Sequence, residues 1–204
     1  MTASPPLASS APKRVAIFCG SRHGRRPAYA RAAVAVGTEL AARGIGVVYG
    51  GGNVGLMGVL ADAALAGGGD VIGVIPESLM AKELGHGGVT QLHVVTSMHE
   101  RKALMADLSD AFLALPGGFG TYEEILEITT WAQLGLHAKP FGLLDIEGFY
   151  QPLLAQFERA VDDGFIEPAQ RELLLVEQNA ETMVERLLTH RPQHFDRWLE
   201  RSER

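Results

Sequence analysis

The stretch LPGGFGTYEE, residues 115–124, holds three glycines within four positions and ends in two adjacent carboxylates. The apolar residues 112–115 predict a strand that leads into it, and residues 122–134 predict a helix that follows it. Glycine in such a turn lets backbone N–H groups close around an anion, and the N-terminus of a helix favours negative charge. The stretch therefore predicts a site for a phosphate-bearing ligand, with Glu123 and Glu124 beside it.

The same alternation of strand and helix continues along the chain in both directions. Apolar runs predict strands over residues 14–19, 45–49, 71–75, 89–95, 112–115 and 141–144. Helical patterns cover residues 27–43, 56–66, 98–108, 122–134, 149–163 and 181–188. Strands that are apolar on both faces and alternate with helices are typical of a parallel sheet sandwiched between helices. The sequence thus predicts a single-domain α/β protein with a Rossmann-like fold.

The predicted domain covers residues 14–190. Residues 1–13 are rich in Ala, Ser and Pro, and they have neither a basic start nor a long apolar stretch. We therefore expect a disordered leader there rather than a signal peptide. Residues 191–204 are expected to form a polar C-terminal tail. A chain of 204 residues is long enough for one sizeable hydrophobic core.

Composition limits the partners that this protein can take. Charged residues make up 21% of the chain and hydrophobic residues 47%, as in ordinary globular proteins. The net charge of −6 argues against non-specific binding to nucleic acid or to an anionic membrane. Cys19 is the one cysteine, and no apolar run approaches the ~20 residues of a membrane span. We therefore expect no disulfide, no cysteine metal cluster, no nucleic-acid or membrane partner, and a cytoplasmic location.

A second glycine-rich segment, GGGNVG at residues 50–55, fits the G-x-G-x-x-G pattern of many dinucleotide-binding domains. The context argues against a dinucleotide, because the pattern follows the second predicted strand instead of the first. Asp70 lies at about the right distance, but it begins a strand instead of ending one. Tight turns with close helix–sheet packing are the structural alternative. The phosphate-binding pattern G-x-x-x-x-G-K-[ST] is absent from the sequence.

The predicted helix that precedes the glycine-rich stretch carries an arginine on its apolar stripe. Met98, Met105 and Leu108 form the stripe at helical spacing, and Arg101 falls in its middle. A guanidinium on a buried face needs a partner, because an unpaired buried charge is very costly. Arg101 is therefore predicted to meet either a carboxylate in a structural ion pair or a ligand group in a cleft. Lys102 points about a quarter turn away and is expected to face solvent.

Several motifs together resemble one enzyme family. The segments MHERK (98–102), LPGGFGTYEE (115–124) and TWAQLG (130–135) are similar to segments of the Lonely Guy family of cytokinin riboside 5′-monophosphate phosphoribohydrolases. The two signatures of that family, P-G-G-x-G-T-x-x-E and an upstream Arg-Lys pair, are intact. CGS (19–21), YGGGNVGLMG (49–58) and GVIPESLMAKEL (73–84) also match, and the resemblance covers residues 14–188.

The resemblance implies roles for individual residues. Arg101 and Glu124 would be the catalytic pair, and Glu123 is a further catalytic candidate, ranked lower because Glu124 holds the last position of the signature. Substrate contacts are implied for Ser21, Gly50, Gly51, Gly52, Glu83, Lys102, Gly117, Gly118, Phe119, Gly120, Thr121, Tyr122 and Thr130. The family also implies a nucleotide 5′-monophosphate substrate and a homodimer, with no metal and no organic cofactor. The loop 21–27 departs from the family in being unusually basic, which leaves its contacts open.

The implied reaction suits these residue types. Breaking the bond between ribose and a base builds positive charge on the sugar. A carboxylate beside C1′ stabilises that charge and takes a proton from the attacking water. Arg101 would act by electrostatics or positioning, because a guanidinium stays charged and is a poor proton donor. The proton donor to the departing base is left open, as is the choice between a prenylated adenine and plain adenine.

Two other functions are alternatives at this point. A lysine decarboxylase, the label that many relatives once carried, would need pyridoxal phosphate on a Schiff-base lysine. No recognisable cofactor setting surrounds any of the four lysines, which are Lys13, Lys82, Lys102 and Lys139. A non-catalytic nucleotide-binding or carrier protein would share the glycine turns, but it would not need Glu124 together with Arg101.

Overall fold

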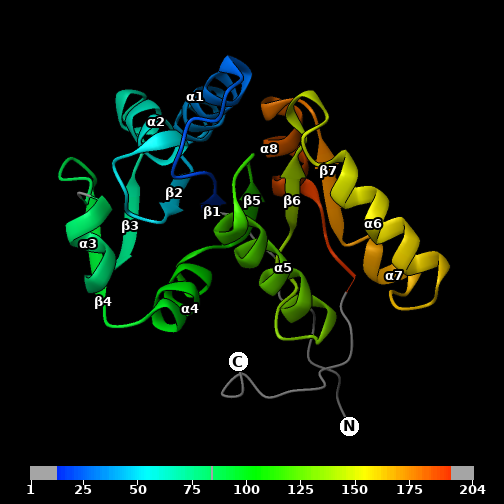
Figure 1. Cartoon of the computed structure of the whole chain (residues 1–204). Coiled ribbons are helices and arrows are strands. Elements are labelled where there is room, and N and C mark those ends of the chain that lie inside the picture. The colour runs from blue at the N-terminus through cyan, green and yellow to red at the C-terminus, as the bar shows by residue number, and fades with distance from the viewer. Residues whose placement is uncertain (1–12, 84, 194–204) are drawn as a thin grey trace, which may run out of the picture.

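The order of the strands places β1 (Arg14–Phe18) at the centre of a parallel sheet (Figure 1). The computed structural model describes residues 13–83 and 85–193, and within them the sheet order is β4-β3-β2-β1-β5-β6-β7. The other strands are β2 (Gly46–Tyr49), β3 (Val71–Pro76), β4 (Gln91–Val95), β5 (Ala111–Ala114), β6 (Phe141–Leu144) and β7 (Leu174–Glu177). Every pair of neighbours in this order is parallel.

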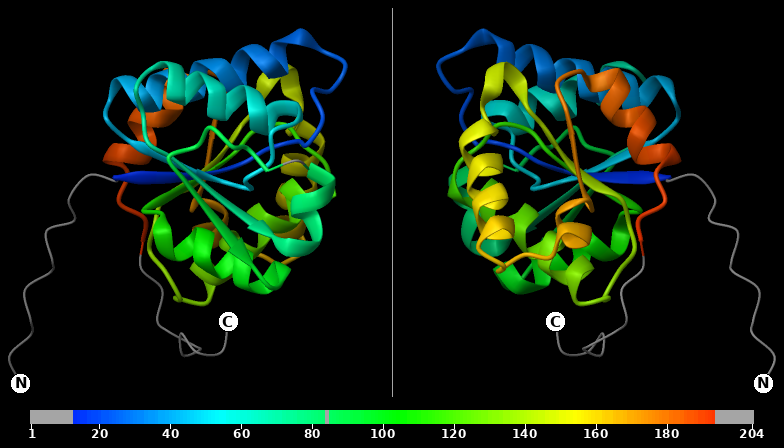
Figure 2. Two further views of the ribbon diagram at one scale, coloured as in Figure 1. Left: turned by 90° about the vertical axis from the view of Figure 1, so that its left-hand side faces the viewer. Right: turned by 90° about the vertical axis from the view of Figure 1, so that its right-hand side faces the viewer.

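Helices cover both faces of the sheet (Figure 2). They are α1 (Pro27–Ala42), α2 (Gly55–Ala66), α3 (Glu77–Glu83), α4 (Met98–Leu108), α5 (Phe119–Gln133), α6 (Gln151–Asp162), α7 (Pro168–Arg171) and α8 (Ala180–Thr189). In Figure 2, α1, α2 and α8 lie on one side of the sheet, and α4 and α5 lie on the other. The predicted α/β class, with a parallel sheet between helical layers, is confirmed.

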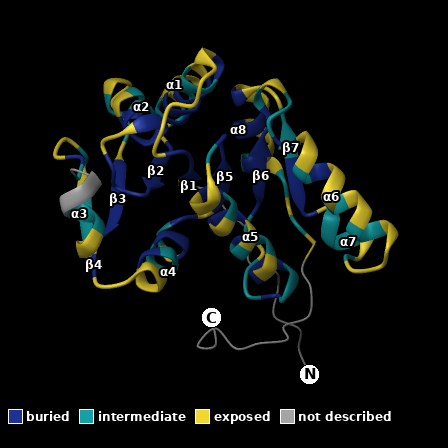
Figure 3. Ribbon diagram, viewed as in Figure 1, coloured by how far each residue is buried: buried dark blue, intermediate teal, exposed yellow. Residues whose placement is uncertain are grey.

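The alternation of side chains along each strand explains the two helical layers. Val15 and Ile17 of β1 pack into the core shared with α1, α2 and α8. Ala16 and Phe18 pack into the core shared with α4, α5 and α6. Because successive side chains of a strand point to opposite faces, a strand that is apolar at every position needs cover on both. Strands β2, β3, β5 and β6 are accordingly dark blue in Figure 3, whereas the edge strand β4 is mostly exposed or half-buried and the outward faces of the helices are yellow.

The direction of strand addition reverses at β1. Strands β2 to β4 extend the sheet on one side of it, and β5 to β7 extend it on the other. Phe18 at the end of β1 pairs with Ala114 at the end of β5, so the turns after these two strands emerge side by side. The backbone N–H of Gly20 donates to the carbonyl of Pro116 at 3.2 Å. Open parallel sheets bind ligands at such a point, and here it holds the glycine-rich stretch.

Some elements differ from the prediction. Strand β7 and helices α3 and α7 were not predicted, and β7 is a short edge strand that is only partly buried. Helix α5 begins at Phe119, three residues earlier than expected, because Gly118 takes the N-cap position. The predicted leader up to residue 12 and the predicted tail from residue 194 lie outside the described residues. Among the described helices, none combines the length and the apolar character needed to cross a bilayer.

Candidate active site

The glycine-rich stretch forms the first turn of α5. Gly118 is the N-cap residue, and neither Thr121 nor any other side chain caps the helix there. Thr121 instead lies in the first turn and is buried against Gly117, where an added Cβ would lie 2.1 Å from the threonine Oγ1. The first N–H groups of a helix have no acceptor within the helix. They therefore point outward over Gly118 and Gly120, where an added Cβ would meet open space.

The turn after β1 packs directly against the turn after β2. The N–H of Leu56 donates to the carbonyl of Gly20 at 3.0 Å. Gly55 has a φ of +61°, and an added Cβ there would lie 2.3 Å from the carbonyl carbon of Ser21. Both the backbone conformation and the close approach demand glycine at this position. The structure thus brings the turns after β1, β2 and β5 to one place at the switch point.

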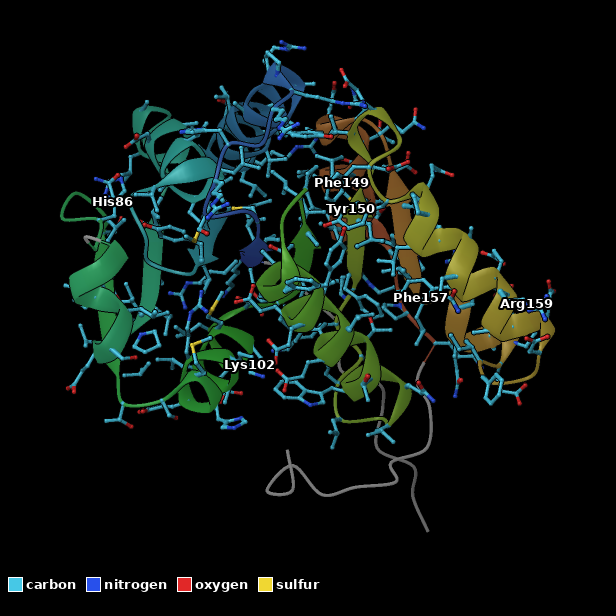
Figure 4. All side chains as sticks on the ribbon, in the orientation of Figure 1. His86, Lys102, Phe149, Tyr150, Phe157 and Arg159 are labelled. Atoms are coloured by element: carbon cyan, nitrogen blue, oxygen red, sulfur yellow. The ribbon has the colours of Figure 1, made fainter. Side chains whose placement is uncertain are left out.

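A cavity of about 400 Å³ opens at this place. The loop after β1 lines it together with the rings of Tyr29 and of Phe149 (labelled in Figure 4), which meet edge to face at 5.6 Å. Its lining includes Gly20, Ser21, Arg22, His23, Gly24, Tyr29, Leu56, Pro116, Gly117, Gly118 and Phe149. The volume suits a small ligand such as a nucleotide. Arg101 and Glu124 do not belong to this lining, so the cavity lies beside the predicted catalytic pair.

Arg101 of α4 and Glu124 of α5 form a buried ion pair. The arginine Nη1 lies 3.2 Å from the glutamate Oε1, and the two residues are 8% and 7% exposed. The Nε of Arg101 donates to the carbonyl of Val74 in β3 at 3.1 Å. The predicted partner for the arginine is therefore a carboxylate. Because the pair lies at the carboxyl ends of the strands, the ion pair and a cleft role are compatible.

Gly50 makes room for the guanidinium. An added Cβ at this position would lie 2.2 Å from Nη2 of Arg101 and 3.1 Å from the sulfur of Met57. The arginine cannot move aside easily, because Glu124 and the Val74 carbonyl both hold it. The structure therefore gives Gly50 a steric role that explains the residue type without any ligand.

Burial raises the pKa of Glu124 to about 7, although the Arg101 guanidinium lowers it. Removal of the carboxylate from water is the largest effect, and the neighbouring Glu123 adds to it. A carboxyl with such a pKa exchanges its proton near neutral pH. General acids and bases work best when their pKa lies near the working pH.

Lys102 does not face solvent as expected. Its side chain is only 10% exposed and its ammonium pairs with Glu123 and with Glu127, the latter at 3.0 Å. Two carboxylates on the neighbouring helix draw it inward (Figure 4). Glu123 and Glu124 lie in the second turn of α5 and not in the first, because the helix begins early. Glu123 is 52% exposed in its side chain, whereas Glu124 is buried, which separates the two candidates.

Comparison with known proteins agrees with these motifs. The family model described as "Possible lysine decarboxylase" matches residues 57–187. The chain is 50% identical to cytokinin riboside 5′-monophosphate phosphoribohydrolase LOG1 from Arabidopsis thaliana, over 89% of this chain and 85% of that one. It is 53% identical to the probable enzyme LOGL9 of the same description from Oryza sativa, over 88% and 79% of the two chains.

The chain belongs to the Lonely Guy family.

Solved structures show the same fold at lower identity. The molybdenum cofactor carrier protein from Chlamydomonas reinhardtii is 23% identical with a TM-score of 0.65, covering 87% of this chain and 98% of that one. The molybdenum cofactor binding protein from Rippkaea orientalis is 20% identical with a TM-score of 0.64, covering 87% and 95%. At such identities the likeness extends to the fold alone.

Other residues to which the Lonely Guy resemblance assigns contacts are not gathered at the ion pair. Thr130 is exposed, its hydroxyl donates to the carbonyl of Leu126, and it borders a separate cavity of about 140 Å³ between α5, α6 and α7. Phe119, the first residue of α5, is 92% exposed. The side chain of Glu83 lies outside the described residues. Met98 is exposed, so the buried apolar stripe around Arg101 is shorter than predicted and consists mainly of Met105.

Two residues that support the glycine turn, Tyr150 and Asp145, were not predicted from the sequence. The hydroxyl of the buried Tyr150 donates to the carbonyl of Leu115 at 2.7 Å, directly before the turn. The N–H of Tyr150 donates to the buried carboxyl of Asp145, also at 2.7 Å. An aromatic residue at a predicted helix start carries no local signal for such a long-range bond. This chain of contacts fixes the turn to the end of β6.

A pair of glycine substitutions tests the steric role of Gly50. We expect Gly50→Ala to lower the free energy of unfolding by about 1–3 kcal/mol, because the new methyl group displaces the paired guanidinium. Gly118→Ala is the matched control, since its φ is −100° and its added Cβ would meet open space. It should change stability by less than about 0.5 kcal/mol. Urea denaturation of both variants decides the matter, and equal stabilities would contradict the assignment.

Proposed function

We propose that the chain hydrolyses the N-glycosidic bond of adenosine 5′-monophosphates, plain or N6-substituted, and releases the free base and ribose 5-phosphate. The observation that carries the proposal is the buried Arg101–Glu124 pair beside the N-terminus of α5. Relatives that are about 50% identical bear the name of this activity. An assay for free base and ribose 5-phosphate from a panel of nucleotides tests it directly.

The phosphate of the substrate binds at the start of α5 in this proposal. The proposed donors are the N–H groups of residues 119–121 at the start of α5 and the hydroxyl of Ser21, which lines the cavity together with Gly117 and Gly118. Donors that meet a charged acceptor make strong hydrogen bonds, and the positive end of the helix dipole adds to them. The anchored phosphate then orients the ribose, so that binding energy far from the broken bond serves the reaction.

Glu124 acts at the anomeric carbon. Its carboxylate stabilises the positive charge that develops on the ribose as the C1′–N bond breaks, and it accepts a proton from the water that attacks C1′. Because its pKa is about 7, the carboxyl holds that proton near neutral pH. The same group can therefore pass it to the departing base, which gives a candidate for the proton donor that the sequence left open. Glu123 is a poorer candidate for this role, because its side chain is 52% exposed and lacks the burial that raises the pKa of Glu124.

Arg101 acts by charge and position. Its guanidinium stays protonated and keeps Glu124 oriented through the 3.2 Å contact. As negative charge builds on the departing base, the same guanidinium stabilises it. The guanidinium also donates from Nε to the Val74 carbonyl, so Glu124 and Val74 together fix the position of the guanidinium.

The assembly and location of the protein belong to this proposal as well. We infer a homodimer from the family resemblance and propose a cytoplasmic location for it. Sedimentation of the purified protein measures the assembly. Neither point bears on the chemistry of the Arg101–Glu124 pair.

A decarboxylase that uses pyridoxal phosphate fits the described lysines poorly. A Schiff base needs a lysine amine free to lose its proton. Lys102 is held by two carboxylates, which raise its pKa against the opposing effect of burial. Lys139 donates to the carbonyls of Ala106 and Ser109 at 2.7 and 2.6 Å, at the end of α4. Neither offers a cofactor-binding amine.

A carrier protein without catalysis is the second candidate. The shared fold with molybdenum cofactor carriers keeps it open, since the glycine turns alone would suffice to bind a ligand. The buried carboxyl with a pKa near 7 favours the hydrolase, because such a group is costly to fold and useful for proton transfer. A carrier would return every bound nucleotide intact, which product analysis detects.

We expect Glu124→Gln to lower the rate of base release by at least ~100-fold, equivalent to ~2.7 kcal/mol, because the charge at C1′ is lost while the shape is kept. Nucleotide binding should persist, since the phosphate donors are untouched. Steady-state assays and calorimetric titration with AMP measure the two quantities. Near-normal turnover by the folded variant would remove Glu124 from the mechanism.

Arg101→Ala and Arg101→Lys should both lower turnover, and lysine should not restore full activity. An ammonium lacks the planar fork that reaches Glu124 and the Val74 carbonyl together. Melting temperature and rate are measured on the same preparations. If the pair is only structural, the lysine variant will lose stability in proportion to its loss of rate and recover turnover at lower temperature.

The substrate should need its 5′-phosphate. We expect adenosine to be cleaved at least ~100-fold less efficiently than AMP, equivalent to ~2.7 kcal/mol, because a truncated substrate loses the interaction that orients its ribose. Release of adenine from AMP and from adenosine, at equal low concentrations, measures the ratio. Equal rates would mean that the start of α5 does not bind phosphate.

A further inference from the structure

Helices α4 and α5 are joined by two adjacent sets of charges. Arg101 pairs with Glu124, and the next residue, Lys102, pairs with both Glu123 and Glu127. The lysine side chain is only 10% exposed and lies between the two helices (Figure 4). A nearly buried ammonium is costly unless it is paired, so its two carboxylate partners define its position.

Lys102 remains charged in this environment. Burial lowers its pKa, but the hydrogen bonds that the ammonium donates to Glu123 and Glu127 more than offset that effect and raise the pKa above the usual value. An ammonium held by two carboxylates would have to leave at least one of them to reach a substrate. That requirement argues against the substrate contact that the family resemblance implies for this residue.

A small cavity connects this cluster to the catalytic carboxyl. It measures about 10 Å³, and its lining comprises Phe18, Lys102, Glu124, Glu127 and Ile128. The volume is that of about one water molecule, which is too small for any part of a nucleotide. Lys102 and Glu124 therefore line the same small space, and the lysine charge acts on the carboxyl over a short range.

We propose that Lys102 is a positioning residue of the proposed hydrolysis, which holds α4 against α5 and keeps Glu124 in its ionised, Arg101-paired form without touching the substrate. The proposal rests on the proposed function for its kinetic consequence. Its physical basis is the Lys102–Glu123–Glu127 cluster and the cavity shared with Glu124.

The charges around Glu124 act in opposite directions. Arg101 and Lys102 of α4 lower its pKa, whereas Glu123 and Glu127 of α5 raise it. Cys19, at the end of β1, adds no charge because burial, with a smaller effect of Glu124, raises the pKa of its thiol. Removal of a positive charge from the cluster should therefore raise the pKa of Glu124, and removal of a negative charge should lower it.

The test is the dependence of kcat/KM for AMP on pH in three variants. Lys102→Met should move the rising limb of the profile to higher pH by about half a unit or more, because the positive charge that favours the ionised form of Glu124 is lost. Glu127→Gln should move the limb to lower pH, because the negative charge that opposes ionisation of Glu124 is lost. Lys102→Arg keeps the charge and should leave the limb close to that of the unmodified protein.

Lys139→Met is the matched control for loss of a lysine that supports α4. Lys139 binds the last carbonyls of the same helix, and it is not among the charges that act on Glu124. It should lower the melting temperature and leave the limb in place. Opposite shifts for Lys102→Met and Glu127→Gln, with no shift for Lys139→Met, support the proposal.

Two results would overturn it. An unchanged limb in Lys102→Met with a lower melting temperature would make the residue merely structural. A raised KM with an unchanged limb would make it a substrate contact. Infrared titration of the Glu124 carboxyl, assigned by its loss in Glu124→Gln, reads the same shifts without turnover. Failure of the unmodified protein to release base would then refute the proposed function, while the infrared shifts still decide the role of Lys102.

Discussion

The buried ion pair between Arg101 and Glu124 sets the conditions that the surrounding structure meets. Two charges with less than a tenth of their surface exposed are stable only if geometry and hydrogen bonds replace the lost water. The carbonyl of Val74 supplies one such bond from β3, and the absence of a side chain at Gly50 supplies the space. The pair thereby links both helices to the strand ends around the switch point.

Glycine serves two different purposes around this pair. At Gly50, Gly55 and Gly117 a side chain would collide with a neighbour, so glycine allows the turns to pack against one another. At Gly118 and Gly120 an added Cβ would meet open space, so packing does not explain the residue type. Open glycines at the start of a helix leave backbone N–H groups accessible to an anion. The second group therefore carries the better argument for a ligand.

The sequence predicted those parts of the structure that depend on local pattern. Strands with an uninterrupted apolar run, such as residues 15–18 of β1 and all of β5, could be recognised because burial on both faces leaves no polar alternation. The start of α5 and the direction of Lys102 could not, because they depend on Gly118 and on carboxylates of another element. The edge strand β7 has only four residues, of which the first two are buried, and so short an apolar run does not distinguish a strand from part of a helix.

Adjacent residues on one helix acquire different chemistry because a helix turns by about 100° per residue. Glu123 points toward Lys102 and solvent, whereas Glu124 points into the core beside Arg101. The exposed acid helps to hold the lysine, and the lysine in turn opposes the effect of burial on the hidden acid. Neither carboxylate is redundant in this arrangement. The pair of acids that closes the glycine-rich stretch thus consists of one group suited to proton transfer and one that tunes its surroundings.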